Sequence, residues 1–353
     1  MSSKKKKMKT PTVSICTPTF NRRPFIPYLI KCIQRQTYPS DKIEWIIVDD
    51  GTDHIEDLVN DIPFVKYFKY DKKMTLGKKR NLMHQKTSGD ILVYMDDDDY
   101  YPPERISHAV EMLQLNPQAL CAGTSEMHIY FKHIQKMYQF GPYGPNHTTA
   151  ATMAFRRELL SQTKYDDTSC LAEEKHFLKN YTVPFVQLEP TKSILVVSHI
   201  HNSFDKKRML DDQTKFINES TKTIDDFIKD PDLKRFYIDE VDDLLDSYEP
   251  GLPLHKQDVV KQTEKMREDR EKMIKDHQTS VFLKMEMQMQ EKMRVYGEQL
   301  KSHYEKIIQD KTILINAVIK RNKELMLKNE EYEKQIAFLQ SKIEYVEVNY
   351  ENK

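Results

Sequence analysis

Apolar and polar positions alternate in a regular way along the first part of the chain. Short apolar runs, each followed by a stretch with helical spacing of its apolar residues, recur from Val13 to about residue 198. Such alternation is typical of repeated βαβ units. Strands are predicted at 13–17, 45–48, 65–68 and 91–95, and helices near Ile55 and at 25–36, 76–86 and 104–115. The first part is therefore predicted to be an α/β domain with a mostly parallel sheet.

The regular alternation ends near residue 120. A segment rich in glycine and proline, 141–145, predicts a loop before 149–155. Loops of this kind commonly form binding surfaces. The remaining elements are predicted as a helix at 173–179, strands at 183–188 and 194–198, and a polar helical segment at 205–246.

The C-terminal part has a different pattern, with apolar residues at heptad spacing. From about Lys256 onward proline is absent and Gly297 is the single glycine. The two heptad rows are Ile308, Ile315, Asn322, Asn329, Ile336, Ile343 and Tyr350, and Tyr304, Lys311, Val318, Leu325, Tyr332, Leu339 and Val346. A shifted frame upstream indicates a stutter near residue 300 and consists of Met289, Met293, Tyr296, Leu300 and Ile307.

This heptad pattern predicts a coiled coil between copies of the chain. Isoleucine in one row with leucine in the other favours two parallel strands, and buried asparagine fixes the register. Tyrosines in both rows are also compatible with a coiled coil of three helices. A homo-oligomer, either a dimer or a trimer, is therefore expected. The alternative is a single solvated helix that folds back on the first domain.

The length of 353 residues allows one α/β domain and additional structure, because single cores stop growing at about 250 to 300 residues. The patterns divide the chain into four parts. They are a disordered basic tail at 1–11, the α/β domain at 12–205, a helical extension at 206–255 and a long helix or coiled coil at 256–353.

Charge and cysteine content narrow the class of protein. Lys+Arg and Asp+Glu both number 55, so no global field favours nucleic acid or membrane. The four cysteines form no CxxC pair, which fits a reducing compartment. No run of about 18 apolar residues occurs, so we expect a cytoplasmic protein without a transmembrane segment. The lysines at 4–7 are read as a solvated tail, with a nuclear or surface-binding tag as the alternative.

Four adjacent carboxylates, Asp96 to Asp99, directly follow the predicted strand at 91–95. Like charges this close raise one another's pKa unless a cation neutralises them, and hard oxygen ligands suit Mg²⁺ or Mn²⁺. Ligands of open α/β sheets bind beyond the carboxyl ends of strands. The cluster therefore indicates a metal site, and an acidic solvated turn is the alternative.

Two further segments could bind a nucleotide. Asp49 and Asp50 end another predicted strand, where a carboxylate could accept a hydrogen bond from a base or a ribose, although Asp-Asp-Gly is also a common turn. The segment 77–81, Gly-Lys-Lys-Arg-Asn, opens a predicted helix, where backbone amides and cations favour a diphosphate.

Together these segments resemble the family 2 glycosyltransferases. The matching stretches are 13–22, Val-Ser-Ile-Cys-Thr-Pro-Thr-Phe-Asn-Arg; 46–52, Ile-Ile-Val-Asp-Asp-Gly-Thr; 77–81; and 88–99, Ser-Gly-Asp-Ile-Leu-Val-Tyr-Met-Asp-Asp-Asp-Asp. Their order and spacing are those of the family, from about Val13 to Asp205. The resemblance implies the GT-A fold, a single Rossmann-like nucleotide-binding domain with a DxD motif.

The resemblance also implies which residues bind the donor. Thr17 and Asp50 would contact the uridine, Asp96 and Asp98 would be the acids of the DxD motif, and Asp97 and Asp99 would give electrostatic support. The implied nucleotide-sugar site consists of Thr17, Pro18, Thr19, Asp50, Lys78, Arg80, Asn81, Asp96 and Asp97. The implied ligands of Mn²⁺ or Mg²⁺ are Asp98, Asp96 and His201.

An inverting transfer needs a general base, and the resemblance implies the pair Glu173 and Glu174, with Glu174 as the base. The alternative is a helix whose first-turn acids favour its dipole. Strand alternation would point His199 and His201 to the same side, although a lone histidine is more often structural. Thr148, Thr149 and Met153 resemble the acceptor-facing region.

The resulting hypothesis is an inverting glycosyltransferase that moves a sugar from a UDP-sugar to a carbohydrate or other hydroxyl acceptor, with Mn²⁺ or Mg²⁺. One rival is a nucleotidyltransferase on a similar α/β fold, which needs no base at Glu174. The other is a coiled-coil scaffold that binds a nucleotide sugar without turning it over.

Overall fold

The computed structural model describes residues 10–202, 206–211 and 215–351. Residues 1–9 of the predicted basic tail and Asp205, predicted to end the first domain, lie outside the described residues. The chain divides into two units, Met1–Glu268 and Asp269–Lys353, which are described separately. None of the helices in the described part is both long and apolar enough to cross a bilayer.

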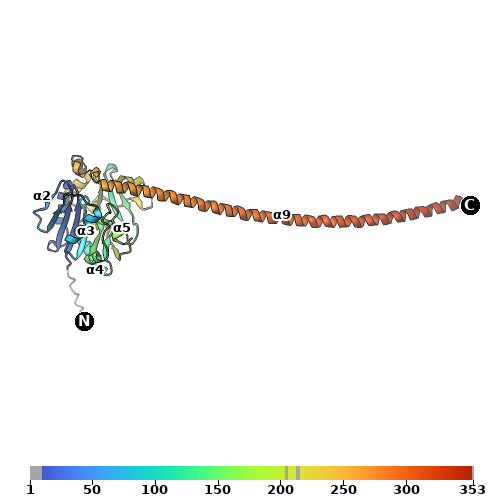
Figure 1. Cartoon of the computed structure of the whole chain (residues 1–353), viewed down its shortest axis with the longest axis horizontal. Helices are drawn as coiled ribbons and strands as arrows, with labels where there is room; N and C mark the ends of the chain where they lie inside the picture. Colours follow the sequence, from blue (N-terminus) through green and yellow to red (C-terminus); the bar gives the residue numbers. More distant parts are fainter. Residues whose placement is uncertain (1–9, 203–205, 212–214, 352–353) are drawn as a thin grey trace, which may run out of the picture. The chain divides into compact units, whose positions relative to one another are not determined.

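A sheet lies in the first unit (Figure 1). It has seven strands in the order β3-β2-β1-β4-β8-β5-β9. Every strand runs parallel to its neighbours except β8, which is antiparallel to β4 and β5. The strands are β1 (Val13–Thr19), β2 (Ile43–Asp49), β3 (Val65–Lys69), β4 (Ile91–Tyr94), β5 (Cys121–Gly123), β8 (Ala154–Arg156) and β9 (Phe185–Gln187). The predicted α/β domain with a mostly parallel sheet is confirmed.

Helices pack on this sheet through apolar faces. In α1 (Ile26–Gln34) and α4 (Arg105–Leu115) the buried residues recur at intervals of three and four positions, as expected for one helical face. The other helices before residue 200 are α2 (Glu56–Val59), α3 (Leu76–Lys86) and α5 (Glu174–Phe177). All seven residues of β1 are buried, as expected for a central strand covered on both faces.

A second sheet of four strands, in the order β10-β6-β7-β11, was not predicted. Its strands are β6 (Met127–Phe131), β7 (Lys136–Phe140), β10 (Val196–Ser198) and β11 (Ile217–Glu219). Strand β11 lies in a segment predicted to be helical. Because β11 pairs with the edge of β7, its backbone amides are satisfied by a partner distant in sequence, and local polarity carries no signal of that pairing.

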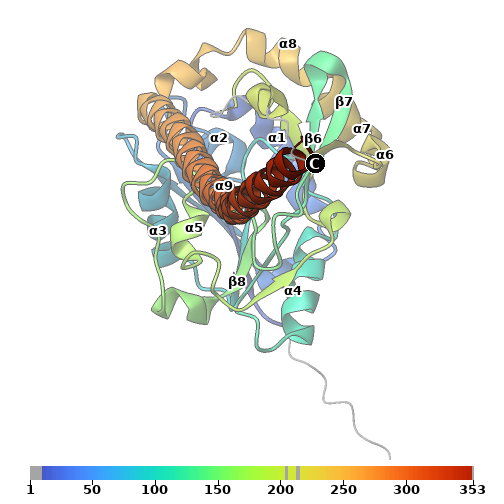
Figure 2. The ribbon, with the colours of Figure 1, turned by 90° about the vertical axis from the view of Figure 1, so that its right-hand side faces the viewer.

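The segment predicted as a separate helical extension belongs to the first unit. It contains α6 (Ile224–Phe227), α7 (Pro231–Arg235), a π-helical turn (Phe236–Glu240) and α8 (Val241–Asp246). Phe236 stacks on Tyr28 of α1, and Phe227 of α6 lies 5.3 Å from the ring of His128 in β6. Figure 2 shows α6 and α7 next to β7. These residues join the main apolar core, so the domain continues past residue 205.

Helix α9 (Gln257–Glu351) begins in the first unit and forms the described part of the second. The predicted long helix is confirmed. Large apolar side chains along its length are exposed in the single chain, including Ile315, Leu325 and Ile336 at 57%, 46% and 54%. Exposed apolar residues at heptad spacing are typical of a coiled coil, and the coiled coil stays a prediction.

Candidate active site

The carboxyl ends of β1, β2 and β4 meet at the point where the strand order changes direction. From β1 the chain continues to β2 and β3 on one side, whereas β4 lies on the other side. Crevices at such a switch point are the usual ligand sites of open α/β sheets. Thr19 ends β1, Asp49 ends β2, and the carboxylates Asp96 to Asp99 follow β4.

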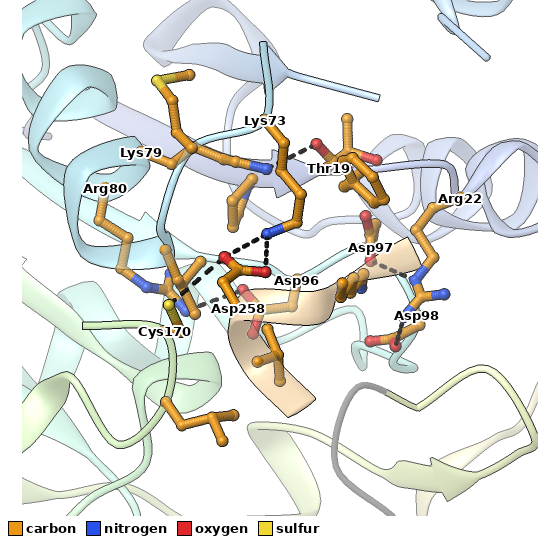
Figure 3. A pocket seen from close by; sticks show the side chains of 17 residues that line it. Thr19, Arg22, Lys73, Lys79, Arg80, Asp96, Asp97, Asp98, Cys170 and Asp258 are labelled. Carbon is orange, nitrogen blue, oxygen red and sulfur yellow. Dashed lines mark hydrogen bonds and ion pairs between the residues drawn. The ribbon is translucent and has the colours of Figure 1, made fainter. Parts of the chain in front are cut away.

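A small pocket with a volume of about 150 Å³ lies at this edge (Figure 3). Of the residues predicted to bind the donor or a metal, six line it: Pro18, Thr19, Arg80, Asp96, Asp97 and Asp98. Six other charged or reactive residues of the lining were not predicted: Arg22, Lys73, Lys79, Cys170, Lys256 and Asp258. The pocket thus mixes acids and cations, as a site for a diphosphate with a metal would require.

The carboxylates of the acidic cluster have different partners. Asp96 lies 3.4 Å from Arg80, and Asp97 lies 3.6 Å from Arg22. Asp98 lies 3.5 Å from Arg22 and 3.4 Å from Nε2 of His199. Burial opposes ionisation of Asp98, but His199 and Arg22 outweigh it and hold the pKa of Asp98 well below its usual range. Asp98 is therefore a fixed negative charge at the pocket.

The other three members of the cluster have raised pKa values, and burial is the largest cause for each, Asp96 included. Burial, with the charge of Asp98, raises the pKa of Asp97 to about 7 and that of Asp99 well above its usual value. Asp99 does not line the pocket, and its backbone carbonyl accepts a hydrogen bond from Tyr237. The four carboxylates are thus not equivalent, and the first and third of them, Asp96 and Asp98, are partly exposed.

The acidic residues fit a hard divalent cation. Within the described ranges, no group of three or more His, Cys, Asp and Glu side chains is arranged to hold a metal ion. Mg²⁺ is commonly bound by one or two carboxylates together with substrate phosphates. Asp96 and Asp98 could hold Mn²⁺ or Mg²⁺ in this way, with the diphosphate supplying further oxygen ligands.

Helix α3 delivers two cations to the pocket, Arg80, which was predicted, and Lys79, which was not. Lys78 is exposed, whereas Lys79 and Arg80 are buried and line the pocket. The side chains of successive residues in a helix point in directions about 100° apart around its axis. A residue on the exposed face can therefore be followed directly by one that points inward. The side chain of Asn81 bonds to Tyr165 and Asp167 and anchors the loop that follows β8.

The two residues predicted to contact uridine, Thr17 and Asp50, have partners within the domain. The hydroxyl of Thr17 donates to the carbonyl of Met95 at 2.7 Å and accepts from the indole of Trp45 at 2.9 Å. Asp50 pairs with Lys79 and accepts from the backbone amide of Met74 at 2.6 Å. Neither lines the pocket, although the partners of Asp50, Lys79 and Met74, do. The predicted contact of Thr17 and Asp50 with uridine stays a prediction.

The start of α3 is packed beneath the loop that carries Cys170. The amide of Gly77 donates to the carbonyl of Ser169 at 2.9 Å. A Cβ atom at Gly77 would collide with the carbonyl of Asp166, so the close approach requires glycine. This contact places Cys170 and Leu171 at the pocket.

Glu173 and Glu174 have different surroundings. Glu173 is buried and accepts a hydrogen bond from Nε of Arg80 at 2.7 Å. Glu174 is partly buried, and burial together with the charge of Glu173 raises its pKa to about 7. A carboxylate with such a pKa is suited to accept a proton near neutral pH. Glu173 fixes Arg80, and Glu174 does not line the pocket, so its role as the general base stays a prediction that its raised pKa fits.

The two histidines after β10 do not point the same way along a strand, because β10 ends at Ser198 and residues 200–201 form a turn. His199, not His201, contacts Asp98. Both ring nitrogens of His201 are buried without a hydrogen-bond partner among the described residues, and its carbonyl accepts from Arg22 at 2.7 Å. The predicted role of His201 at a metal remains a prediction.

The region predicted to face an acceptor is largely internal. Thr148 and Met153 are fully buried, and Thr148 bonds to Thr152 at 2.8 Å. Thr149 contacts Met127 of the second sheet. These residues support the wall between the sheets, and none of them lines the pocket.

A mostly parallel sheet with paired acids and cations at its switch point defines the nucleotide-binding α/β class. Residues 14–167 match the model of the family described as glycosyl transferase family 2. This part of the chain, a little less than half of it, is therefore similar to that family. The match includes the acidic cluster and ends before Glu173 and Glu174.

The chain is similar to curated relatives and to a solved structure over part of their length. An uncharacterized glycosyltransferase of Haemophilus influenzae is 29% identical over 106 residues, 30% of this chain and 35% of the relative. A GalNAc(5)-diNAcBac-PP-undecaprenol beta-1,3-glucosyltransferase of Campylobacter jejuni is 33% identical over 96 residues, 25% of this chain and 30% of the relative. The crystal structure of residues 1–349 of Staphylococcus aureus TarS has 18% identity and a TM-score of 0.44, over 53% of this chain and 60% of that one. The chain thus spans about a third of the length of these two curated relatives.

Proposed function

We propose that the protein transfers a sugar from a UDP-sugar to a hydroxyl group of a carbohydrate or other acceptor, with inversion at the anomeric carbon. The observation that carries the proposal is the pocket at the switch point, which brings Asp96 and Asp98 together with Arg22, Lys79 and Arg80. The similarity to the family supports sugar transfer and inversion, and the name of the Campylobacter relative supports a hexosyl group.

In this proposal one group of residues binds the donor and another residue acts on the acceptor. Arg22, Lys79 and Arg80 neutralise the diphosphate, and Asp96 and Asp98 hold Mn²⁺ or Mg²⁺. The metal stabilises the negative charge that develops on the leaving nucleoside diphosphate. Glu174 takes the proton of the acceptor hydroxyl as its oxygen attacks the anomeric carbon. The raised pKa of Glu174 favours this reaction over nucleotidyl transfer, which needs no base there.

The proposal is tested by release of free nucleotide from a panel of UDP- and GDP-sugars, with Mn²⁺ and with EDTA. We expect one donor to be turned over, and EDTA to lower its rate by at least about 10²-fold because the charge on the leaving group is then uncompensated. Metal-dependent binding of a donor without turnover would support the scaffold reading. Binding of no donor at all would refute the proposed roles of these acids.

We also propose that residues beyond about 300 join two or three copies of the chain. The support is the exposure of the heptad rows of α9 in the single chain. A double variant, Ile315→Asp with Ile336→Asp, is expected to be monomeric, because both substitutions place a charge in the buried contact between the helices of the coiled coil. Ile313→Asp with Leu327→Asp, at outer heptad positions of similar exposure, is the matched control and should leave the oligomer intact.

Light scattering at micromolar concentration measures the oligomeric state. A native chain that is already monomeric would contradict the proposal, and equal dissociation by both pairs of substitutions would contradict the register. The cytoplasmic location stays a prediction, supported by Cys16, Cys32, Cys121 and Cys170, which are all free thiols.

A further inference from the structure

The first turn of α9 forms one wall of the pocket. Lys256, Asp258 and Val259 line it, although they follow Asp98 by more than 150 positions in the sequence. Figure 3 shows Asp258 between Lys73 and Cys170, facing the side of the pocket that holds Asp96. These residues belong to the first unit, which extends to Glu268.

Specific contacts hold this turn in place. Asp258 forms an ion pair with Lys73, and its carboxylate lies 3.5 Å from the sulfur of Cys170. The backbone amide of Cys170 donates to the side chain of Gln262, one turn further along α9, at 2.6 Å. Val259 is buried, with 7% of its surface exposed. The wall is therefore a packed part of the domain.

Three lysines gather around one aromatic ring at this wall. The ammonium groups of Lys73, Lys79 and Lys256 lie 5.5, 5.9 and 5.9 Å from the centre of the Phe20 ring. Like charges so close repel one another and need negative charge nearby. Asp258 supplies one such charge to Lys73, and Asp50 supplies another to Lys79.

Lys256 lines the same pocket as Arg22, Asp97 and Asp98. Burial and the charge of Arg22 lower the pKa of Lys256 to about 7, whereas Asp97 and Asp98 favour its charged form, as an added diphosphate would. A cation there can compensate charge on the leaving diphosphate, as Arg and Lys residues do at transferring phosphoryl groups. Lys256 thus lines the same pocket as Arg22, Lys79 and Arg80, the cations proposed to neutralise the diphosphate.

We propose that Lys256 binds the β-phosphate of the donor, so that the start of α9 is part of the donor site; this inference rests on the proposed function.

The test is calorimetric titration of the full chain with UDP and GDP in the presence of Mg²⁺. The nucleotide that binds is then compared with its monophosphate. Lys256→Met should weaken diphosphate binding about 10- to 100-fold, the loss expected for one hydrogen bond between charged groups. Monophosphate binding should change by less than about 3-fold, because the β-phosphate is the missing partner.

Two variants serve as controls. Lys256→Arg keeps the charge and should recover most of the affinity for the diphosphate. Lys261→Met removes an exposed lysine from the same helix and should bind like the native chain. This pair separates the charge at position 256 from a general effect of altering α9.

The remaining outcomes overturn the proposal in distinguishable ways. Equal diphosphate affinity for Lys256→Met and Lys261→Met would refute the role of Lys256 and leave the proposed function standing. Equal loss for the monophosphate and the diphosphate would show that Lys256 only supports the fold of the pocket. If the native chain binds neither UDP nor GDP, the proposed function fails and this inference fails with it.

Discussion

Asp98→Asn is expected to turn over the donor about 10²- to 10³-fold more slowly than the native chain, the usual cost of removing one preorganised charge from an active site. Asp98 is the member of the acidic cluster that Arg22 and His199 hold in the ionised form. Asparagine keeps the shape of the side chain but cannot neutralise a cation. The metal and the diphosphate would then be held in a pocket with an excess of positive charge.

Initial rates of nucleotide release at saturating Mn²⁺ measure this effect. Asp41→Asn is a suitable control, because Asp41 is 72% exposed and lies outside the pocket. The thermal unfolding midpoint of both variants should be recorded, since a destabilised Asp98→Asn chain would lose activity for a trivial reason. Native-like turnover by a stably folded Asp98→Asn would rule out Asp98 as the metal ligand.

Glu174→Gln is expected to lower turnover about 10²- to 10⁴-fold, the range for loss of a general base. The sign of its pH dependence follows from the raised pKa of Glu174, about 7. Below this value the carboxyl is protonated and cannot accept a proton, so kcat/KM of the native chain should rise as the pH increases through about 7. The residual activity of Glu174→Gln should lack this rise.

A pH–rate profile from about pH 5 to about pH 9 makes the comparison. Glu173→Gln is the informative neighbour, because Glu173 pairs with Arg80 and should affect donor KM. Since the charge of Glu173 also helps to raise the pKa of Glu174, the rise should move to lower pH in this variant but should not disappear. Glu158→Gln, at an exposed position, controls for loss of negative charge alone. If Glu174→Gln retains the same pH dependence, another group is the base.

The fold could be predicted because its main signals are local. The apolar runs that became β1, β2 and β4 are each buried on both faces, so they read as continuous apolar segments rather than alternating ones. The acidic cluster was found because it directly follows one of these runs. The second sheet could not be predicted, because β10 pairs with β6 and β11 pairs with β7, and these segments are distant in sequence.

The site was predicted in part, for similar reasons. Motif position located Asp96 to Asp98 and Arg80, but it could not distinguish Lys78 from Lys79, which differ only by rotation about α3. His201 was predicted from the resemblance to the family, whereas the contact of His199 with Asp98 depends on how the chain continues after β10 ends at Ser198. Arg22 was visible as the last residue of the first matching stretch. Lys256 and Asp258 gave no signal, because only the folded chain brings them to the pocket.

The four cysteines have a chemical consequence. Cys16, Cys32, Cys121 and Cys170 are all buried, and burial raises the pKa of each thiol, to about 11 for Cys32 and Cys170. Oxidants and disulfides react with the thiolate, and these thiols are kept in the protonated form. Folding itself therefore shields the chain from oxidation, and the intact domain can tolerate a change of redox conditions that would cross-link its unfolded form.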